Sequence, residues 1–444
     1  MMKRFLAVLL VCCLAFSMFA CSSSSKTTEE TKDKPTDSAT VVSKDTSKVA
    51  PANDKPLILA WLGTGQDKVS LDKNLKVYTD KTGVKVESLF IPGTWAEYFT
   101  KMQTMIAGGD TIDNAFIAVE GFRMFVDLGL AAPLSKYAAD GGSEIKAVID
   151  DISPNIMKSV YVDNELYAAP TEWNNGVMHF NTKRLEEAGL SIPSENWTKE
   201  EFLDYCKKLT KEVNGKKQYA IAITDHYMVA ESWLYTNGAA YMTDDFKKST
   251  INSPESIEIF QLWQDLIYKY KYAPIPEKNV DIIQQLIDGT VAMGSWGRWP
   301  SMQYLANDFK DVAVQYLPNF KKKATAFGVG GIAVMKQSKR FEEAAKLAFW
   351  MATPEFGTNF FSAGAIPASR TIANDVIPKL GFPKNFELFY GSSEIAVVTH
   401  SPIQYPECES IVLRAMSDIL TNQKDVKTTL DAAAAEMDAV LSAN

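Results

Sequence analysis

Two tryptophans and an arginine stand close together in the stretch at 288–300, which reads Asp-Gly-Thr-Val-Ala-Met-Gly-Ser-Trp-Gly-Arg-Trp-Pro. They are Trp296, Arg298 and Trp299. An indole offers an apolar face to the carbon face of a sugar ring, and a guanidinium offers hydrogen-bond donors in a fixed fork. The spacing therefore suits a ring-shaped polar ligand. The alternative is that both tryptophans are core anchors, because tryptophan side chains are usually well buried.

The residues before this turn predict the elements that position it. Gly289 ends a helix, and Thr290 to Met293 predicts a short buried strand. Open α/β sheets form their binding crevices at the carboxyl ends of strands, so we expect the turn to lie at such a crevice. If Arg298 faces the ligand, it would favour an acidic sugar such as a uronate, since guanidinium pairs with carboxylate at two points. Alternatively, Arg298 closes a salt bridge within its own lobe.

Strands and helices alternate along the first part of the chain. An apolar run at 56–62, which contains Trp61, predicts a buried strand, and a helix is expected at about 69–82. A further strand at 110–119 ends beside Glu120. Because strands joined through helices usually pair in parallel, the pattern predicts an α/β fold with a mainly parallel sheet.

A second series of strands and helices begins after Pro170. The stretch at 171–176 contains Trp173 and Asn174 and is typical of a crossover between two lobes, where hinge residues generally lie. A chain of 444 residues is also too long for one ordinary core and suits two lobes. The tail, from about 411 to 441, predicts two amphipathic helices.

Three helix starts carry capping signals. Thr94 is expected to cap one helix, Thr198 forms a capping box with Glu201, and Ser253 precedes a proline at the first helical position. These signals predict where the helices begin.

The composition limits the classes of partner. Charged residues make up 23% of the chain and hydrophobic residues 46%, which is typical of a globular protein. The formal net charge of −8 argues against nucleic acid as a partner, because phosphate-binding surfaces are normally basic.

The first twenty residues are typical of a secretory signal peptide. Lys3 and Arg4 precede an apolar run, and small residues follow it. The sequence Ser-Met-Phe-Ala-Cys, which ends at Cys21, resembles a bacterial lipobox. We therefore expect Cys21 to be lipidated and to anchor the chain to the outer face of the cytoplasmic membrane; the alternative is cleavage elsewhere. Residues 22–54, rich in serine, threonine and charge, predict a disordered tether.

The sequence lacks common motifs of catalysis and cofactor binding. It contains no Gly-x-x-x-x-Gly-Lys loop, no Gly-x-Ser-x-Gly elbow and no His-Glu-x-x-His pair. We therefore expect no catalytic residue, no cofactor and no metal, while calcium binding stays open. Cys206 and Cys408 could form a disulfide only if the fold brings them together.

Four segments of the chain together carry a family likeness. They are Met-Ile-Ala-Gly-Gly-Asp at 105–110 with Asp113; Tyr-Ala-Ala-Pro, Phe-Asn-Thr and Ala-Gly-Leu within 167–190; Gly-Thr-Val-Ala-Met-Gly at 289–294 with Trp296; and Gly-Gly-Ile at 330–332 through Ser-Lys and Ala-Ala to 345. In this order and spacing they resemble the extracellular solute-binding proteins of sugar ABC importers, family 1, which are similar to maltose-binding protein.

The resemblance implies a two-lobed periplasmic-binding-protein-like fold of type II. Its lobes would be joined by a hinge of crossing segments near Pro170, near Phe327 and at 363–368, and the C-terminal region would be helical. The implied division of the chain is a signal peptide at 1–20, the lipidated cysteine and tether at 21–55, the first lobe at 56–170 and 324–366, the second lobe at 171–323, and its C-terminal helices at 367–444.

The resemblance also indicates ligand-binding positions. Glu120 matches an acidic residue that takes sugar hydroxyls, Asn174 a polar residue past the first crossing, and Trp296 an aromatic platform. A further stacking residue is often found at the position of 405–408, although the family's usual tryptophan is absent there. Glu120 could instead be an exposed loop acid, Trp233 a core residue of a helix and Asn174 a turn former. The full candidate set is Trp61, Glu120, Trp173, Asn174, Trp233, Trp296, Arg298, Tyr405 and Glu407.

The predicted function is that of a monomeric, lipid-anchored solute-binding protein. It would capture a carbohydrate, such as an oligosaccharide, between its lobes and deliver it to the transmembrane subunits of an ABC permease. One alternative is a secreted glycoside hydrolase, in which Glu120 would pair with Glu172 or Glu231 for acid and base catalysis. Another is a sugar-sensing subunit of a receptor.

Overall fold

The computed structural model describes residues 55–63, 65–278, 280–360 and 364–443. The chain divides into two units, 1–50 and 51–444, and the fold described below belongs to the second. The predicted signal peptide, the lipidation site at Cys21 and most of the predicted tether lie outside the described residues.

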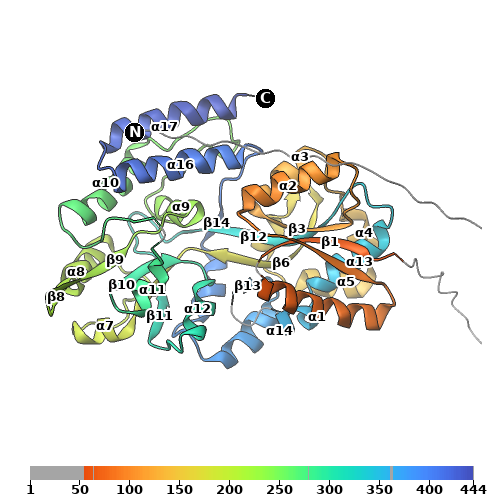
Figure 1. Cartoon of the computed structure of the whole chain (residues 1–444), viewed down its shortest axis with the longest axis horizontal. Helices are drawn as coiled ribbons and strands as arrows, with labels where there is room; N and C mark the ends of the chain where they lie inside the picture. The colour runs from red at the N-terminus through yellow and green to blue at the C-terminus, as the bar shows by residue number, and fades with distance from the viewer. Residues whose placement is uncertain (1–54, 64, 279, 361–363, 444) are drawn as a thin grey trace, which may run out of the picture. The chain divides into compact units, whose positions relative to one another are not determined.

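The fold contains two mixed β-sheets (Figure 1). The larger sheet has seven strands in the order β13-β6-β12-β3-β1-β2, and β14 also pairs with β12. The smaller sheet has five strands in the order β11-β7-β10-β9-β8. Strands of the larger sheet are β1 Leu57–Leu62, β2 Val86–Ile91, β3 Asn114–Ala118, β6 Ala168–Asn175, β12 Thr325–Val334, β13 Ile366–Pro367 and β14 Ala396–Val398. Those of the smaller sheet are β7 Val177–Asn181, β8 Lys211–Val213, β9 Lys216–Ala222, β10 Val291–Trp296 and β11 Val312–Gln315, while β4 Tyr161–Val162 and β5 Glu165–Leu166 form a hairpin.

Helices pack around both sheets. Those whose side chains join the core of the larger sheet are α1 Gly65–Thr82, α2 Trp95–Ala107, α3 Val119–Asp127, α6 Pro154–Lys158, α13 Phe341–Met351, α14 Pro354–Phe360 and α15 Glu387–Gly391, with α4 Ser135–Asp140 and α5 Gly142–Asp150 packed against it. Those around the smaller sheet are α7 Thr182–Glu187, α8 Lys199–Leu209, α9 Tyr227–Thr236, α10 Pro254–Tyr268, α11 Ile282–Ile287, α12 Pro300–Ala306, α16 Tyr405–Leu420 and α17 Val426–Leu441. The remaining turns are η1 Ile372–Val376, η2 Ile377–Leu380 and η3 Ser392–Glu394.

The α/β architecture confirms the predicted fold class, but the larger sheet is not mainly parallel. Strand β1 pairs in parallel with β2 and β3, as the alternating pattern indicates. However, β12 joins the sheet from residues 325–334 and runs antiparallel to both β3 and β6. Strand β12 is a late return of the chain, so the local βαβ pattern does not determine its direction.

The predicted helix starts are confirmed by capping contacts. The Thr94 hydroxyl accepts a hydrogen bond from the Glu97 amide, and the Glu97 carboxylate accepts one from the Thr94 amide. Thr198 and Glu201 make the same reciprocal pair ahead of α8. Ser253 caps α10. These bonds satisfy amide groups that the first turn of a helix leaves without intrahelical partners.

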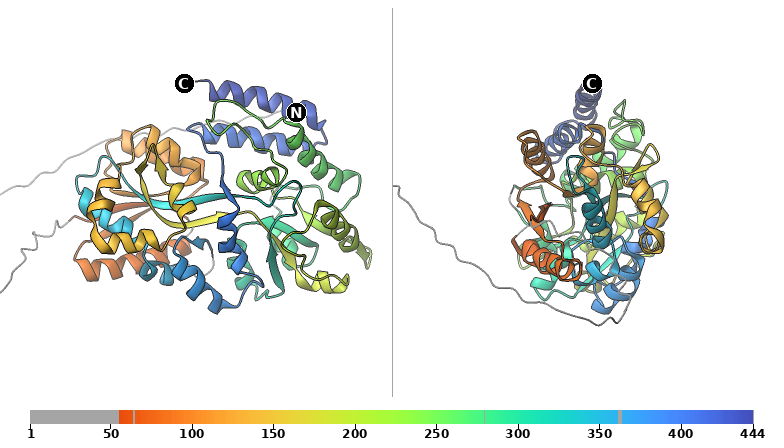
Figure 2. Two further views of the ribbon diagram at one scale, coloured as in Figure 1. Left: turned by 180° about the vertical axis from the view of Figure 1, so that it is seen from behind. Right: turned by 90° about the vertical axis from the view of Figure 1, so that its right-hand side faces the viewer.

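The two C-terminal helices, α16 and α17, lie side by side (Figures 1 and 2). The structure confirms the two helices predicted from the tail, although α16 begins earlier than expected, at Tyr405. Their apolar faces join the core of the smaller sheet. Asn252 and the Ser249 amide, both ahead of α10, donate hydrogen bonds to Asp431 and Asp438 of α17.

Strands β6 and β12 pair along most of their length (Figure 1). The predicted lobe boundary at 170 falls within β6, and residues 396–398, which the prediction gives to the second lobe, form β14 on the larger sheet. The division into lobes at those residue numbers stays a prediction. Strand β6 is paired with β12 on both sides of residue 170, and β14 also pairs with β12. The paired strands therefore extend beyond the predicted lobe bounds.

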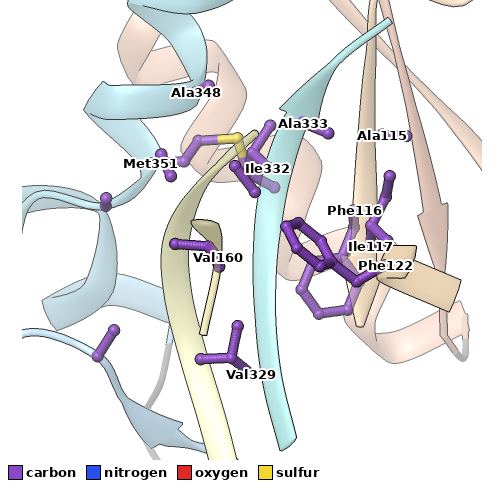
Figure 3. Packing of buried hydrophobic residues seen from close by; sticks show 14 of the residues in the cluster. Ala115, Phe116, Ile117, Phe122, Val160, Val329, Ile332, Ala333, Ala348 and Met351 are labelled. Atoms are coloured by element: carbon purple, nitrogen blue, oxygen red, sulfur yellow. The ribbon is translucent and has the colours of Figure 1, made fainter. Parts of the chain in front are cut away.

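The core of the larger sheet packs on both sides of β12. Figure 3 shows Met351 of α13 beside Ile332, with Phe116 and Phe122 on the other side of the strand. All four side chains are buried. Burial of such side chains removes apolar area from water, which is the main favourable contribution to folding.

None of the helices in the described ranges has the length and apolar character needed to cross a lipid bilayer.

The glycine at 331 is expected to be essential for the pairing of β6 and β12. A Cβ atom at Gly331 would lie 2.7 Å from the Ala169 carbonyl oxygen and 3.2 Å from Pro170 Cα, both of them backbone atoms. We expect Gly331→Ala to lower the free energy of unfolding by about 2 kcal/mol because the backbone must shift to relieve the overlap. Urea unfolding measures this.

Gly364→Ala is the matched control for that substitution. Among the described residues, a Cβ at Gly364 meets only Met302, at 3.5 Å or more. The control should change the midpoint little. Equal destabilisation by both substitutions would contradict the role given to Gly331.

Candidate functional site

A cavity of about 300 Å³ lies between elements of the two sheets. This volume is at the lower end of the range for small-molecule sites. The larger sheet contributes β3, β6 and β12, while the other side is formed by residues at the start of α9 and after β10. The lining residues are Trp95, Phe116, Ala118, Glu120, Glu172, Trp173, Asn174, His226, Met228, Trp299, Gly328, Val329 and Gly330.

Glycines on β12 leave room for this cavity and for the close approach of the two sides. A Cβ atom at Gly328 would lie 2.5 Å from Val119 Cγ1 and 3.4 Å from Met228 Sδ. A Cβ at Gly330 would lie 2.7 Å from the Phe116 ring. These positions therefore require residues without side chains.

Two tryptophans present partly exposed indoles at the cavity. Trp95 is the first residue of α2 and stacks on Phe99, with ring centroids 5.5 Å apart and planes 20° apart. Trp299 stacks on His226, with centroids 5.3 Å apart and planes 25° apart. Each indole is thus held by an aromatic neighbour, which limits its rotation.

The turn that carries Trp299 is tied to β6 by a hydrogen bond. The Arg298 amide donates to Asn174 Oδ1 across 3.0 Å. Gly297 makes this approach possible, because a Cβ there would lie 2.2 Å from the Trp299 ring and 2.8 Å from Asn174 Oδ1. The contact joins residues that are far apart in the sequence and holds Trp299 beside the cavity.

Glu120 lies in the first turn of α3 and is only 9% exposed. Burial raises its pKa to about 7, and the nearby Glu409 carboxylate adds to the rise. A hydrogen bond from the backbone N–H of Glu120 to its own carboxylate lowers the pKa in part. No lysine, arginine or histidine forms an ion pair with Glu120 in the described part of the chain. The cavity therefore contains a buried acid without a cationic partner.

His226 adds a neutral polar ring to the cavity. Burial lowers the pKa of this imidazole to about 4, so the ring is uncharged at neutral pH. Its Nδ1 atom has no hydrogen-bond partner among the described residues. An unpaired buried polar atom is unfavourable, which leaves this nitrogen able to gain from a bound polar group.

Three of the nine residues proposed from the sequence come together at the cavity: Glu120, Trp173 and Asn174. Trp173 is nearly fully buried and contributes mainly as packing, since its ring lies edge-on to Phe327 and Tyr390. Asn174 lines the cavity and also anchors the turn after β10.

Trp61 and Trp233 lie in the cores instead. Trp61 is 3% exposed and stacks on Phe116 within the larger sheet's core. Trp233 is 2% exposed, packs edge-on against Phe202, and donates its indole N–H to Ser295 Oγ at 3.0 Å. Neither side chain lines the cavity, so ligand contact at Trp61 and Trp233 stays a prediction.

Trp296 and Arg298 also lie away from the cavity lining. Trp296 is 1% exposed and packs edge-on to His179 in a small core of the smaller sheet. The Arg298 side chain is 2% exposed, and its Nη1 donates to the Ala365 carbonyl oxygen at 2.5 Å. Burial lowers the pKa of its guanidinium to about 10. Trp299, three residues further on, is the indole of this turn that lines the cavity.

Tyr405 and Glu407 begin α16 and do not line the cavity. Tyr405 is 2% exposed and donates its hydroxyl to Glu409 Oε1 at 3.0 Å. Glu407 is exposed on the helix surface. Tyr405 is a core residue, and its ring packs edge-on against Tyr227.

The sequence contained weak signals for the residues that were missed. Trp299 belongs to the same turn as Trp296, but the pattern could not tell which indole is buried. The sequence predicts Trp95 on the apolar face of a helix, and only the structure places it at the cavity. His226 precedes a helix in which every residue is buried, so no periodicity pointed to it.

Cys206 and Cys408 are both buried and carry free thiols. Both lie in the core of the smaller sheet, and burial raises the pKa of Cys408 to about 12. Cys206 and Cys408 therefore do not form a disulfide with each other, and both are core residues.

Two separate mixed sheets, each covered by helices, with a cavity between their elements, define a two-lobed α/β fold. The chain belongs to the family of bacterial extracellular solute-binding proteins, whose model matches residues 74–380. That family consists of solute-binding proteins rather than enzymes.

Solved structures share this fold. An ABC substrate-binding protein from Listeria monocytogenes, in complex with cycloalternan, aligns with a TM-score of 0.76 at 22% identity and covers 87% of this chain and 98% of that one. The sugar-binding protein MalE from Xanthomonas citri aligns with a TM-score of 0.75 at 15% identity, covering 87% and 98%. Among sequences, the galactooligosaccharide-binding protein of Bacillus subtilis is 24% identical over 306 residues, 66% of this chain and 69% of that protein.

The buried carboxyl of Glu120 should make stability depend on pH. Its pKa is about 7 in the folded state against an ordinary value of 4.5, so the folded state binds the proton more tightly. Stability should therefore fall as pH rises from about 4.5 to 7. Glu120→Gln should remove this component and raise the free energy of unfolding at pH 8 by on the order of 2 kcal/mol.

Chemical unfolding of both proteins between pH 5 and pH 8 tests this. Glu407→Gln, at an exposed position, is the control and should follow the unmodified protein. Parallel pH profiles for the Glu120→Gln and unmodified proteins would refute the assignment.

Proposed function

We propose that this chain is the sugar-binding component of an ABC importer and that the cavity beside β6 and β12 holds the carbohydrate. One observation carries the proposal: two partly exposed indoles, from Trp95 and Trp299, line a cavity that also contains a carboxyl and an amide. The names of the similar proteins, which mention galactooligosaccharide, cycloalternan and sugar, support the same class of ligand.

The chemistry of a sugar matches these side chains. Its ring carbons form apolar faces that stack on an indole, and its hydroxyls both donate and accept hydrogen bonds. Glu120 and Glu172 supply acceptors, and the Asn174 amide adds a donor. A cavity that joins aromatic faces to a few placed polar groups is the usual form of a small-molecule site.

The two sides of the cavity also suggest how sugar binding is signalled to the permease. Trp95 and Glu120 belong to elements packed on the larger sheet, whereas His226 and Trp299 belong to elements of the smaller one. A sugar that contacts both sides favours conformations in which they are close, so it shifts the population toward a closed form. A permease that recognises the closed form would then receive only loaded protein.

The alternatives from the sequence gain less support. For a glycoside hydrolase, Glu120 and Glu172 line one cavity, but Glu231 is fully buried and bonded to His400 and Thr399. The family is also one of solute-binding proteins. A sugar-sensing receptor subunit would use the same cavity and differs only in its membrane partner.

Aromatic truncation tests the proposed site. Trp299→Ala and Trp95→Ala should each weaken sugar binding about 10- to 100-fold, because central aromatic contacts dominate binding energies. Isothermal titration calorimetry with a panel of oligosaccharides measures the affinities. Tyr270→Ala, which removes a surface ring that is 38% exposed, is the control and should bind normally. Unchanged affinity in both tryptophan variants would place the sugar elsewhere.

The lipid anchor at Cys21 is part of the same proposal. A chain held at the outer face of the cytoplasmic membrane keeps captured sugar close to its permease, which raises the effective concentration of the loaded protein there. Cys21→Ala should remove incorporated radiolabelled palmitate and release the protein from the membrane fraction, while sugar affinity stays the same. Continued labelling of the variant would contradict lipidation at this cysteine.

A further inference from the structure

We propose that the cavity selects glycans without negative charge and favours a glycan that bears an amino group next to Glu120. This inference rests on the proposed function and adds the charge class of the sugar. It differs from the hypothesis, based on Arg298 in the sequence, that the ligand is an acidic sugar.

The ionisable side chains that line the cavity are acidic or neutral. They are Glu120, Glu172 and His226, and no lysine or arginine is among the lining residues. The His226 ring is uncharged at neutral pH, since burial lowers its pKa. A ligand carboxylate would thus meet acidic side chains and no lysine or arginine among the lining residues, and like charges placed together oppose binding.

The Arg298 side chain, on which the uronate hypothesis depends, does not line this cavity. The Arg298 guanidinium donates to the Ala365 carbonyl and lines a separate cavity of about 230 Å³, together with Pro367 and Tyr390. Its backbone amide faces β6, where it donates to Asn174. The condition for an acidic ligand, a guanidinium turned toward the sugar, is not met.

Glu120 is the second and independent observation. Its side chain is more than nine-tenths buried and lines the cavity, yet no cationic side chain pairs with it in the part of the chain that the structure covers. A buried charge is costly unless it is paired. The charged group that raises the pKa of Glu120 further is another acid, Glu409 of α16.

A ligand ammonium group would supply the missing partner. It would donate charge-assisted hydrogen bonds to the Glu120 carboxylate, which are stronger than bonds between neutral groups. A neutral hydroxyl in the same place would donate one ordinary hydrogen bond. An N-acetylated amine keeps the nitrogen but carries no charge, so it separates the effect of charge from that of shape.

A matched glycan panel tests the inference. The panel contains mono- and disaccharides of the gluco and galacto series, each in neutral, amino, N-acetylamino and uronate forms. Calorimetry at about pH 7 and low salt should show the amino form of the bound series at least about 10-fold tighter than the neutral form, and the uronate at least about 10-fold weaker. Added salt should reduce the amino preference, because it screens the attraction.

Glu120→Gln is the decisive variant. It should bring the ratio of amino to neutral affinity close to one, whereas Glu407→Gln should leave this ratio as it is in the unmodified protein. A thermal unfolding transition checks that each variant is folded.

The outcomes separate this inference from the proposed function. Binding of neutral sugars with a uronate that is equally tight, or an amino preference that survives Glu120→Gln, would overturn the charge selectivity and leave sugar binding intact. If no glycan bound to the folded protein, both the sugar proposal and the selectivity would be overturned.

Discussion

The pairing of β6 with β12 is the constraint on which the rest of this structure depends. The two strands come from residues about 150 positions apart and run antiparallel from Asn175 opposite Phe327 to Ala168 opposite Ala333. Closing a chain segment of this length is entropically unfavourable, and the hydrogen-bonded ladder and the buried side chains offset it. The same two strands form one wall of the cavity, through Asn174 and Gly328. Fold and site therefore share one set of contacts.

The aromatic residues divide between the cores and the cavity by small geometric differences. Trp296 ends β10 and fills the space left by Gly294, whose added Cβ would lie 2.1 Å from the indole. Trp299 follows a turn that Gly297 allows, and its ring reaches His226 instead. Three residues thus separate a core anchor from a cavity wall. The turn also decides electrostatics, because it sends the Arg298 side chain away and leaves the cavity with carboxylates.

Sequence reasoning recovered the fold class and most elements because these depend on local patterns. The helix cap at Thr94, the apolar strand that was predicted at 290–293 and is observed at 291–296, and the two C-terminal helices each follow from neighbours along the chain. The direction of β12 in its sheet did not, since it is set by partners distant in sequence. Of the residues predicted for the site, Glu120, Trp173 and Asn174 line the cavity, whereas the other six do not.

The sequence by itself determined an α/β chain, the starts of three capped helices, an acidic net charge and a tryptophan-rich turn after a buried strand. Tertiary structure alone decided which indoles stay partly exposed and where the guanidinium goes. The physical reason is that a tryptophan gains as much from a core as from a sugar face, so its residue type cannot distinguish them. Only the positions of neighbours such as His226, Ala365 and Gly297 make that choice.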